Sequence, residues 1–222
     1  VRVRVRVRVR ELVRVEADSP DLYGISLGKV ESKWNILDVD RILRAIEPLA
    51  GVEPGLTKIV AWAETASALV DARDIAASSS RVIALAFGAE DFTNDMGIER
   101  SDAGDEVQVP RSLVPVAARA ANVASLDSPF VAFQDPGALR ADAQRARQMG
   151  YTGKHAIHPA QLDIINEVFS PAPDEVSYAR RIMEAWDKAQ AEGRGSLAMD
   201  GRMVDVPVVK RAQNLLAFAD AI

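Results

Sequence analysis

The chain contains KIVAWAE at residues 58–64 and RVIALAFGAED at residues 81–91, two apolar runs that each end in carboxylates. Both runs are almost continuously apolar, which is typical of strands buried on both faces of a parallel sheet. The Ala-rich stretch at 65–79 between them has helical character, and parallel strands require such a crossover. The sequence therefore predicts an α/β fold built from successive strand–helix units.

The same alternation extends outward in both directions. Further strands are predicted at 22–30, 129–134 and 154–158, and further helices at 111–122, 136–149 and 159–169. Asn35 is predicted to cap a helix after the first of these strands. No glycine fingerprint for a dinucleotide or a nucleoside triphosphate follows any strand, which favours a TIM (β/α)8-type barrel over a doubly wound sheet. Together with the segment at the front of the chain, six candidate strands are present where a closed barrel has eight, so the first strands are expected to be missing from this chain.

The pattern changes after Pro171, where a long amphipathic helix is predicted at about 173–192. A hairpin that turns at Asp200-Gly201 and a final helix follow it. The expected organisation is a barrel domain at 1–170 and a C-terminal extension at 171–222. This extension has more apolar helix than an isolated appendage can bury, so we expect it to cover a neighbouring subunit of a homo-oligomer.

The composition is that of an ordinary globular protein, with 48% hydrophobic and 27% charged residues. The 27 basic and 32 acidic side chains give a net charge of −5. No apolar run approaches the ~20 residues of a membrane span, so no membrane partner is expected. The absence of cysteine excludes a disulfide scaffold and a cysteine nucleophile, and it predicts a cytoplasmic location.

Residues 1–10 form the strict alternation VRVRVRVRVR, which places every arginine on one face of a strand. An edge or barrel strand, or an artificial stretch, is the simplest interpretation. A basic arm for nucleic acid is the alternative, but no aromatic residues are interleaved for base stacking and no binding module follows. No nucleic-acid partner is therefore predicted.

Glu64 and Asp91 follow two successive predicted strands, whose carboxyl ends meet at one edge of a parallel sheet. Neighbouring strands are ~4.8 Å apart, so the two carboxylates can converge on one ion. Oxygen ligands without cysteine favour Mg²⁺, with Mn²⁺ as the alternative. The competing interpretation is that one carboxylate caps the next helix. Only one of Glu90 and Asp91 is expected to face the metal, and the spacing of His155 and His158 argues against a shared histidine site.

Seven motifs occur in an order that resembles the citrate lyase β-subunit-like proteins of the HpcH/HpaI aldolase superfamily. The motifs are KVES (29–32), ETASAL (64–69), FGAEDF (87–92), VPRS (109–112), GKHAIHPAQ (153–161), NEVFSP (166–171) and DGRMVDVPVVKRA (200–212). The resemblance implies a TIM barrel and a Mg²⁺-dependent lyase that cleaves or forms a C–C bond in a 3-hydroxyacyl-CoA such as citryl-, malyl- or citramalyl-CoA. The expected products are an acetyl-CoA-type thioester and a keto acid.

The resemblance also implies roles for individual residues. Glu64 and Asp91 match the metal ligands of the family, with Glu64 also at the substrate, and Arg14 matches an arginine that holds the substrate carboxylate. Asp205 matches an acid/base residue delivered into a neighbouring subunit, which suggests a homotrimer or hexamer. From the residues alone, Asp205 is simply the N-cap of the last helix. Three differences from the family pattern are Glu16, where an asparagine is usual, Gly28, where a proline is usual, and the lack of an acidic LDLED-like motif.

Two other functions stay open at this point. Relatives in the same family hydrolyse malyl-CoA thioesters, and the same metal site would serve a thioesterase. A catalytically silent subunit that binds CoA esters is the second alternative, which the missing early strands favour and the intact Glu64–Asp91 pair opposes.

Overall fold

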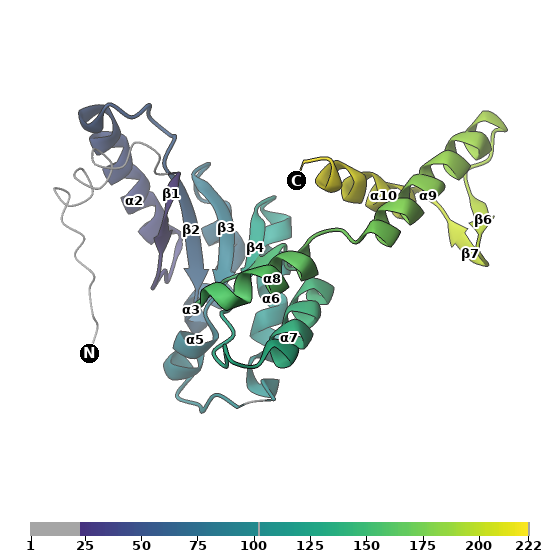
Figure 1. Ribbon diagram of the computed structural model, residues 1–222. Coiled ribbons are helices and arrows are strands. Elements are labelled where there is room, and N and C mark those ends of the chain that lie inside the picture. Colours follow the sequence, from purple (N-terminus) through teal and green to yellow (C-terminus); the bar gives the residue numbers. More distant parts are fainter. Residues whose placement is uncertain (1–22, 102, 222) are drawn as a thin grey trace. The chain divides into compact units, whose positions relative to one another are not determined.

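The computed structural model describes residues 23–101 and 103–221, and the chain divides into two compact units at 1–161 and 162–222 (Figure 1). Each unit is described by itself below. The VR run at 1–10 and Arg14 lie outside the described residues. The predicted domain boundary after residue 170 stays a prediction.

The first unit is built on a five-stranded parallel sheet whose spatial order follows the chain order. Its strands are β1 (Gly24–Leu27), β2 (Lys58–Ala63), β3 (Val82–Phe87), β4 (Ala124–Asp127) and β5 (Gly153–Lys154). Because every neighbouring pair is parallel, all five strands end at the same edge of the sheet. This arrangement is that of consecutive (β/α) units of a barrel.

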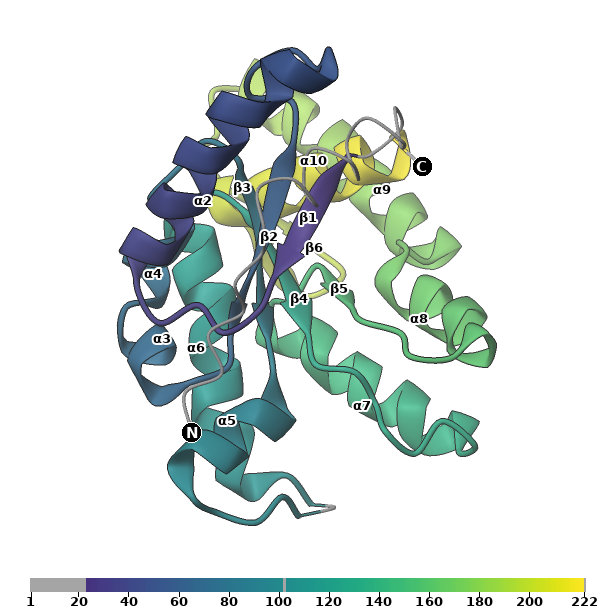
Figure 2. The same ribbon diagram turned by 90° about the vertical axis from the view of Figure 1, so that its left-hand side faces the viewer.

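Helices connect the strands and cover one face of the sheet, as Figure 2 shows for α2, α4 and α6. The helices and 3₁₀ turns of this unit are α2 (Lys33–Ile46), η1 (Glu47–Ala50), α3 (Ala66–Val70), α4 (Ala72–Ala76), α5 (Ala89–Met96), η2 (Asp105–Val107), α6 (Gln108–Ala120), α7 (Pro136–Met149) and η3 (Pro159–Gln161). Side chains of β2 alternate in burial, with Ile59, Ala61 and Ala63 fully buried. Trp62 and Glu64 belong to the opposite face, because successive side chains of a strand alternate.

The fourth strand lies at 124–127, so the predicted strand at 129–134 is wrong. Asn122 adopts a left-handed backbone (φ 56°) that ends α6 and lets the chain enter the sheet directly. Residues 129–134 instead form an irregular loop with a turn at 133–134, and the N–H of Phe133 is bonded to the carbonyl of Val131. Gln161 also donates to the carbonyl of Phe130 at 2.7 Å, which holds this loop away from a strand ladder.

Three smaller expectations also need correction. The Ala-rich segment at 65–79 is two short helices, because Asp71 leaves helical geometry (φ −95°, ψ 10°) between α3 and α4. The N-cap of α2 is Ser32 and not Asn35. Asn35 is the third residue of the helix, and its side chain accepts hydrogen bonds from the N–H groups of Glu31 and Ser32. β5 ends at Lys154, so the two histidines lie in the loop beyond it.

The second unit consists of α8 (Leu162–Phe169), α9 (Pro173–Ala191), the hairpin β6 (Leu197–Met199) and β7 (Arg202–Val204), and α10 (Val206–Ala219). The predicted hairpin turn is confirmed, since Asp200 (φ 51°) and Gly201 (φ 73°) both have the positive φ of a type I′ turn. Trp186 and Ile182 of α9 pack with Val204 and Val209 into a core of their own. Among the described residues, no helix is both long and apolar enough to cross a membrane.

Candidate active site

The candidate site lies at the edge of the sheet where the strands end. Glu64 follows β2 directly, and Asp91 lies in the first turn of α5, immediately after β3. The register pairs Ala63 with Phe87, so Glu64 is level with the start of α5. Leu27 pairs with Ala61, which brings the residues after β1 to the same level as Glu64.

Two glycines leave room for the carboxylate of Glu64, which is only 5% exposed. A Cβ atom added to Gly88 would lie 2.8 Å from both Cβ and Oε2 of Glu64. A Cβ atom at Gly28 would lie 3.2 Å from Oε1 of the same side chain. Gly28, which stands where the family pattern has a proline, therefore lies next to Glu64, the candidate metal ligand.

Lys29 joins the two carboxylates. Its ammonium is ion-paired with Asp91 and lies 3.8 Å from Oε1 of Glu64. Its backbone N–H donates to Oε1 of Glu64 at 2.5 Å. The structure thus confirms that Glu64 and Asp91 converge, and it adds a lysine that sequence reasoning missed.

The electrostatics of the pair favour a bound cation. Burial raises the pKa of Glu64, and repulsion by Asp91 raises it further, while the hydrogen bond and charge of Lys29 act in the opposite direction. The hydrogen bond with Asp91 raises the pKa of Lys29, which stays protonated. A positive ion between the two carboxylates reduces the repulsion between Glu64 and Asp91, which is one of the causes that raise the pKa of Glu64.

Glu90 points away from this pair, as expected from its position next to Asp91. Its carboxylate lies 3.5 Å from Arg100, which also donates to Glu106 at 2.6 Å. Of the two neighbouring acids in α5, Asp91 is the one that meets Lys29 and Glu64. Whether Asp91 binds a metal stays a prediction.

A buried ion network at the ends of β4 and β5 was not found by sequence reasoning. Arg111 donates to both carboxylate oxygens of Asp127 at 2.8 and 2.6 Å, and Lys154 donates to Asp127 at 2.5 Å and to Asp142 at 2.6 Å. Asp127 is fully buried and Lys154 is 8% exposed. Arg111 belongs to the VPRS motif and was therefore noted in the sequence. Its partner Asp127 was not, because Asp127 lies on β4, a strand that was predicted at 129–134 instead.

Ser128 connects this network to the candidate site. Its hydroxyl accepts from the N–H of Ala89 and donates to the carbonyl of Phe87, both at 2.8 Å. Lys154 donates to the carbonyl of Ser128 at 2.6 Å. These bonds fix the junction between β3 and α5, and therefore the start of the helix that carries Asp91.

The donor set suits a hard divalent cation. Within residues 23–101 and 103–221, no group of three or more His, Cys, Asp or Glu side chains is placed to hold a metal. The site therefore offers two carboxylates, and water or substrate oxygens would complete the coordination, as is usual for Mg²⁺. The ammonium of Lys29 between the carboxylates shows that the pair accommodates a cation.

The two histidines do not form a joint metal site. His155 stacks on Trp62 with ring centroids 4.4 Å apart, and His158 stacks on Phe133 at 4.9 Å. Burial lowers the pKa of His155, whose Nε2 is buried without a hydrogen-bond partner. Each ring thus has its own aromatic neighbour.

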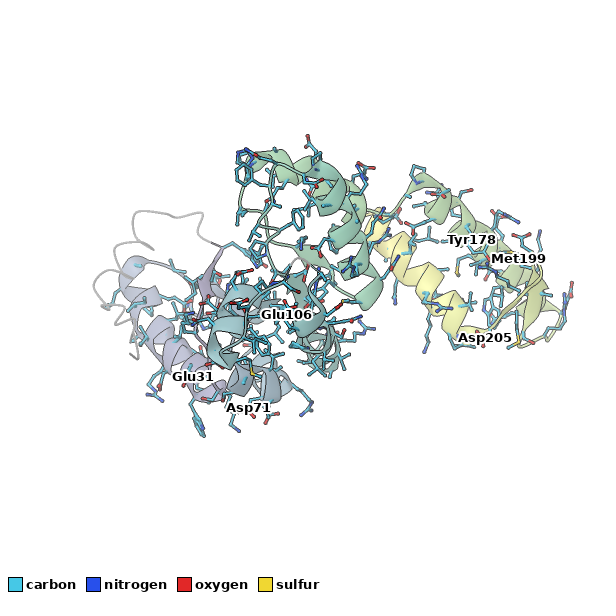
Figure 3. The ribbon with its side chains drawn as sticks, turned by 90° about the horizontal axis from the view of Figure 1, so that it is seen from below. Glu31, Asp71, Glu106, Tyr178, Met199 and Asp205 are labelled. Atoms are coloured by element: carbon cyan, nitrogen blue, oxygen red, sulfur yellow. The ribbon has the colours of Figure 1, made fainter. Side chains whose placement is uncertain are left out.

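Asp205 belongs to the second unit, where the hairpin ends and α10 begins (Figure 3). Its backbone is extended and its carboxylate accepts from the N–H of Val208 at 3.3 Å, which makes it the N-cap of α10. The capping role derived from the sequence is confirmed. The catalytic role implied by the resemblance stays a prediction.

Residues 1–159 match the model of the HpcH/HpaI aldolase/citrate lyase family. The chain belongs to this family. The HpcH/HpaI match spans the five-stranded sheet and includes both Glu64 and Asp91.

Two curated relatives illustrate the range of the HpcH/HpaI family. Citrate lyase subunit beta of Escherichia coli K12 is 34% identical over 196 residues, which cover 88% of this chain. The chain spans 65% of the length of that relative. A protein of Cereibacter sphaeroides named (3S)-malyl-CoA thioesterase is also 34% identical, over 86% of this chain and 67% of its own length.

Solved structures of family members confirm the fold class. A citrate lyase from Burkholderia xenovorans superimposes with a TM-score of 0.84 at 25% identity, covering 96% of this chain and 68% of the other. CitE from Mycobacterium tuberculosis, in complex with magnesium, acetoacetate and coenzyme A, gives a TM-score of 0.72 at 26% identity, covering 97% and 75%. The five-stranded sheet is thus part of a TIM-barrel-type α/β fold.

Proposed function

We propose that this protein is a Mg²⁺-dependent carbon–carbon lyase that acts on a 3-hydroxyacyl-CoA such as citryl-, malyl- or citramalyl-CoA. The observation that carries the proposal is that Glu64 and Asp91 meet at the ammonium of Lys29, at the carboxyl edge of the sheet. Active sites of TIM barrels lie at this edge. The magnesium and coenzyme A of the CitE complex support the same interpretation.

Glu64 and Asp91 would hold the metal, with Mn²⁺ as an alternative to Mg²⁺. When bound, the cation would supply Lewis-acid chemistry that lowers the pKa of the substrate hydroxyl and polarises the developing carbonyl. The contribution of the chain is to place two hard ligands side by side. Gly28 and Gly88 leave the space that Glu64 needs, and Ser128 fixes the start of the helix that carries Asp91.

Two further residues, Arg14 and Asp205, have proposed roles outside the metal site. Arg14, which lies outside the described residues, would bind the substrate carboxylate through its planar guanidinium. Asp205 would exchange a proton with the carbon of the acetyl-CoA-type product after C–C cleavage. From the resemblance to the citrate lyase β-subunit-like proteins, we propose that Asp205 acts in the site of a neighbouring subunit within a homotrimer or hexamer.

A malyl-CoA-type thioesterase is the second candidate, favoured by the 34% identity to the Cereibacter sphaeroides thioesterase. It would use the same two carboxylates and the same metal. The two reactions differ in which bond breaks, the C–C bond or the thioester bond, and so their products differ.

Product analysis tests the proposal. The full chain is incubated with citryl-, malyl- and citramalyl-CoA in the presence of Mg²⁺, and the products are separated by liquid chromatography. A lyase releases an acetyl-CoA-type thioester and a keto acid, and a chelator should abolish their release. Free CoA with an intact hydroxy acid would identify a thioesterase. No turnover of any ester would contradict both candidates and indicate a catalytically silent subunit.

A further inference from the structure

Lys29 is the link between the two candidate metal ligands, and about half of its own side chain is exposed to solvent. Its ammonium pairs with Asp91 and lies 3.8 Å from Glu64, yet 54% of the lysine side chain is exposed. The side chain of Asp91 is 48% exposed, whereas that of Glu64 is 7% exposed. The lysine therefore reaches over the pair from the solvent side, on a flexible stem.

The backbone at Lys29 is unusual. Its φ of 55° lies in the left-handed region, which a lysine adopts only at an energetic cost. This conformation accompanies the 2.5 Å hydrogen bond from the Lys29 N–H to Glu64, while the side chain of the same residue contacts Asp91. Strained residues of this kind concentrate at functional sites. Lys29 thus contacts the carboxylates of both Glu64 and Asp91, and its strained backbone indicates that this position has a function in the site.

A divalent cation and the ammonium compete for the same carboxylates. The two negative charges need positive charge nearby, which the ammonium supplies when no metal is bound. A metal ligated by Asp91 would take the contact that the ammonium makes, and the two positive charges would repel each other at this distance. The exposed lysine can leave, while the buried Glu64 cannot.

We propose that Lys29 is an exchangeable counter-cation of the metal site, whose ammonium holds Glu64 and Asp91 together in the metal-free protein and leaves Asp91 when a divalent cation binds. This inference rests on the proposed metal site. The exchange makes metal binding weaker than it would be at an unpaired carboxylate pair. It also gives a divalent cation an electrostatic advantage over a monovalent one, because a monovalent ion would only replace one positive charge by another.

The test measures binding of Mn²⁺ to the full chain without substrate, by electron paramagnetic resonance of the free ion. Lys29→Met removes the competing charge, so it should bind Mn²⁺ about threefold to tenfold more tightly than the wild type. Lys29→Asn should do the same, and asparagine tolerates the left-handed backbone, so this variant guards against a folding defect. Lys29→Arg keeps the charge and should stay near the wild-type affinity.

Lys33→Met is the matched control, because it removes one positive charge from a lysine that lies over Trp34 instead of at the carboxylates. It should leave the Mn²⁺ affinity unchanged. A second readout is the rate at which an amine-reactive ester labels Lys29, measured by mass spectrometry. Saturating Mg²⁺ should speed the labelling of Lys29 and leave that of Lys33 unchanged.

The outcomes separate this inference from the proposed function. Mn²⁺ binding that is weaker or unchanged in both Lys29→Met and Lys29→Asn would overturn the exchange, and so would labelling of Lys29 that Mg²⁺ does not alter. Mn²⁺ binding that persists undiminished in Asp91→Asn would instead overturn the metal site itself, and the exchange with it.

Discussion

At the scale of single residues, the position of Glu64 depends on what its neighbours lack. Gly88 and Gly28 have no side chain, and a Cβ atom at these positions would lie 2.8 Å and 3.2 Å, respectively, from the carboxylate oxygens of Glu64. The rule that parallel strands end at one edge predicted that Glu64 and Asp91 can converge, with a helix cap as the competing interpretation. The roles of Gly88 and Lys29 could not be predicted, because they depend on side-chain approach and on a left-handed backbone.

Gly88→Ala should impair the metal site without unfolding the protein. Gly88 has a negative φ of −114°, so the backbone accepts alanine, but the new Cβ would clash at 2.8 Å with Glu64. We expect Mn²⁺ affinity to fall about tenfold or more, since one of two protein ligands is displaced. Gly137→Ala is the control, because its Cβ would meet only Asp135 at an ordinary 3.5 Å. Wild-type Mn²⁺ affinity in Gly88→Ala would show that the carboxylate of Glu64 is not a ligand.

At the scale of elements, local pattern predicted β2, β3, the long helix α9 and the hairpin well. These segments have strong periodicity or a turn with a defined backbone requirement. The fourth strand was missed because Pro129 and the apolar residues after it imitate a strand, while the real one is the short ASLD at 124–127. The buried network around Asp127 was lost with that strand.

The opposite end of the sheet has an ion cluster that should make stability depend on pH. Arg81 donates to Asp40 at 2.5 Å and to Glu47 at 2.6 Å, and all three residues are buried. Burial opposes the ionisation of Glu47, but hydrogen bonds from Arg81 and from the N–H groups of Gly55 and Thr57 outweigh it and lower the pKa to about 2.

A carboxyl pKa that is lowered by folding stabilises the protein above its ordinary pKa. The contribution of Glu47 should therefore be complete above about pH 4.5 and be lost as the pH falls towards about 2. Its size is up to about 3 kcal/mol. Urea unfolding at several pH values measures it: Glu47→Gln should flatten this part of the profile, whereas the exposed control Glu53→Gln should not. A wild-type profile that is flat between these pH values would contradict the role of the cluster.

At the scale of the whole molecule, the second unit has its own core and ends in a helix capped by Asp205. We expect a homo-oligomer, and light scattering that finds a monomer at micromolar concentration would refute this.

The cap was predictable from sequence, because the Asp at 205 and the Pro at 207 match a helix start. A role in another subunit cannot be derived from one chain.

Asp205→Asn separates capping from proton transfer, since asparagine caps helices as well as aspartate does. The variant should keep its fold and assembly, while turnover falls by ~10²-fold or more. Mixing Asp205→Asn with Asp91→Asn protomers should restore activity once subunits exchange, because some sites then have both intact residues. If exchange is verified and activity does not return, Asp205 does not act in a neighbouring site.

Glu64 and Asp91 are proposed to hold the metal that the reaction requires, and one comparison of variants tests this assignment directly. Turnover of the preferred CoA ester is measured at saturating substrate and Mg²⁺ for Asp91→Asn, Glu64→Gln and Glu90→Gln, with circular dichroism to verify the fold. Glu90 is the matched control, since it adjoins Asp91 in α5 but pairs with Arg100. We predict that Asp91→Asn and Glu64→Gln abolish turnover and that Glu90→Gln stays within about twofold of the wild type. Near-normal turnover in Asp91→Asn or Glu64→Gln would contradict the assignment.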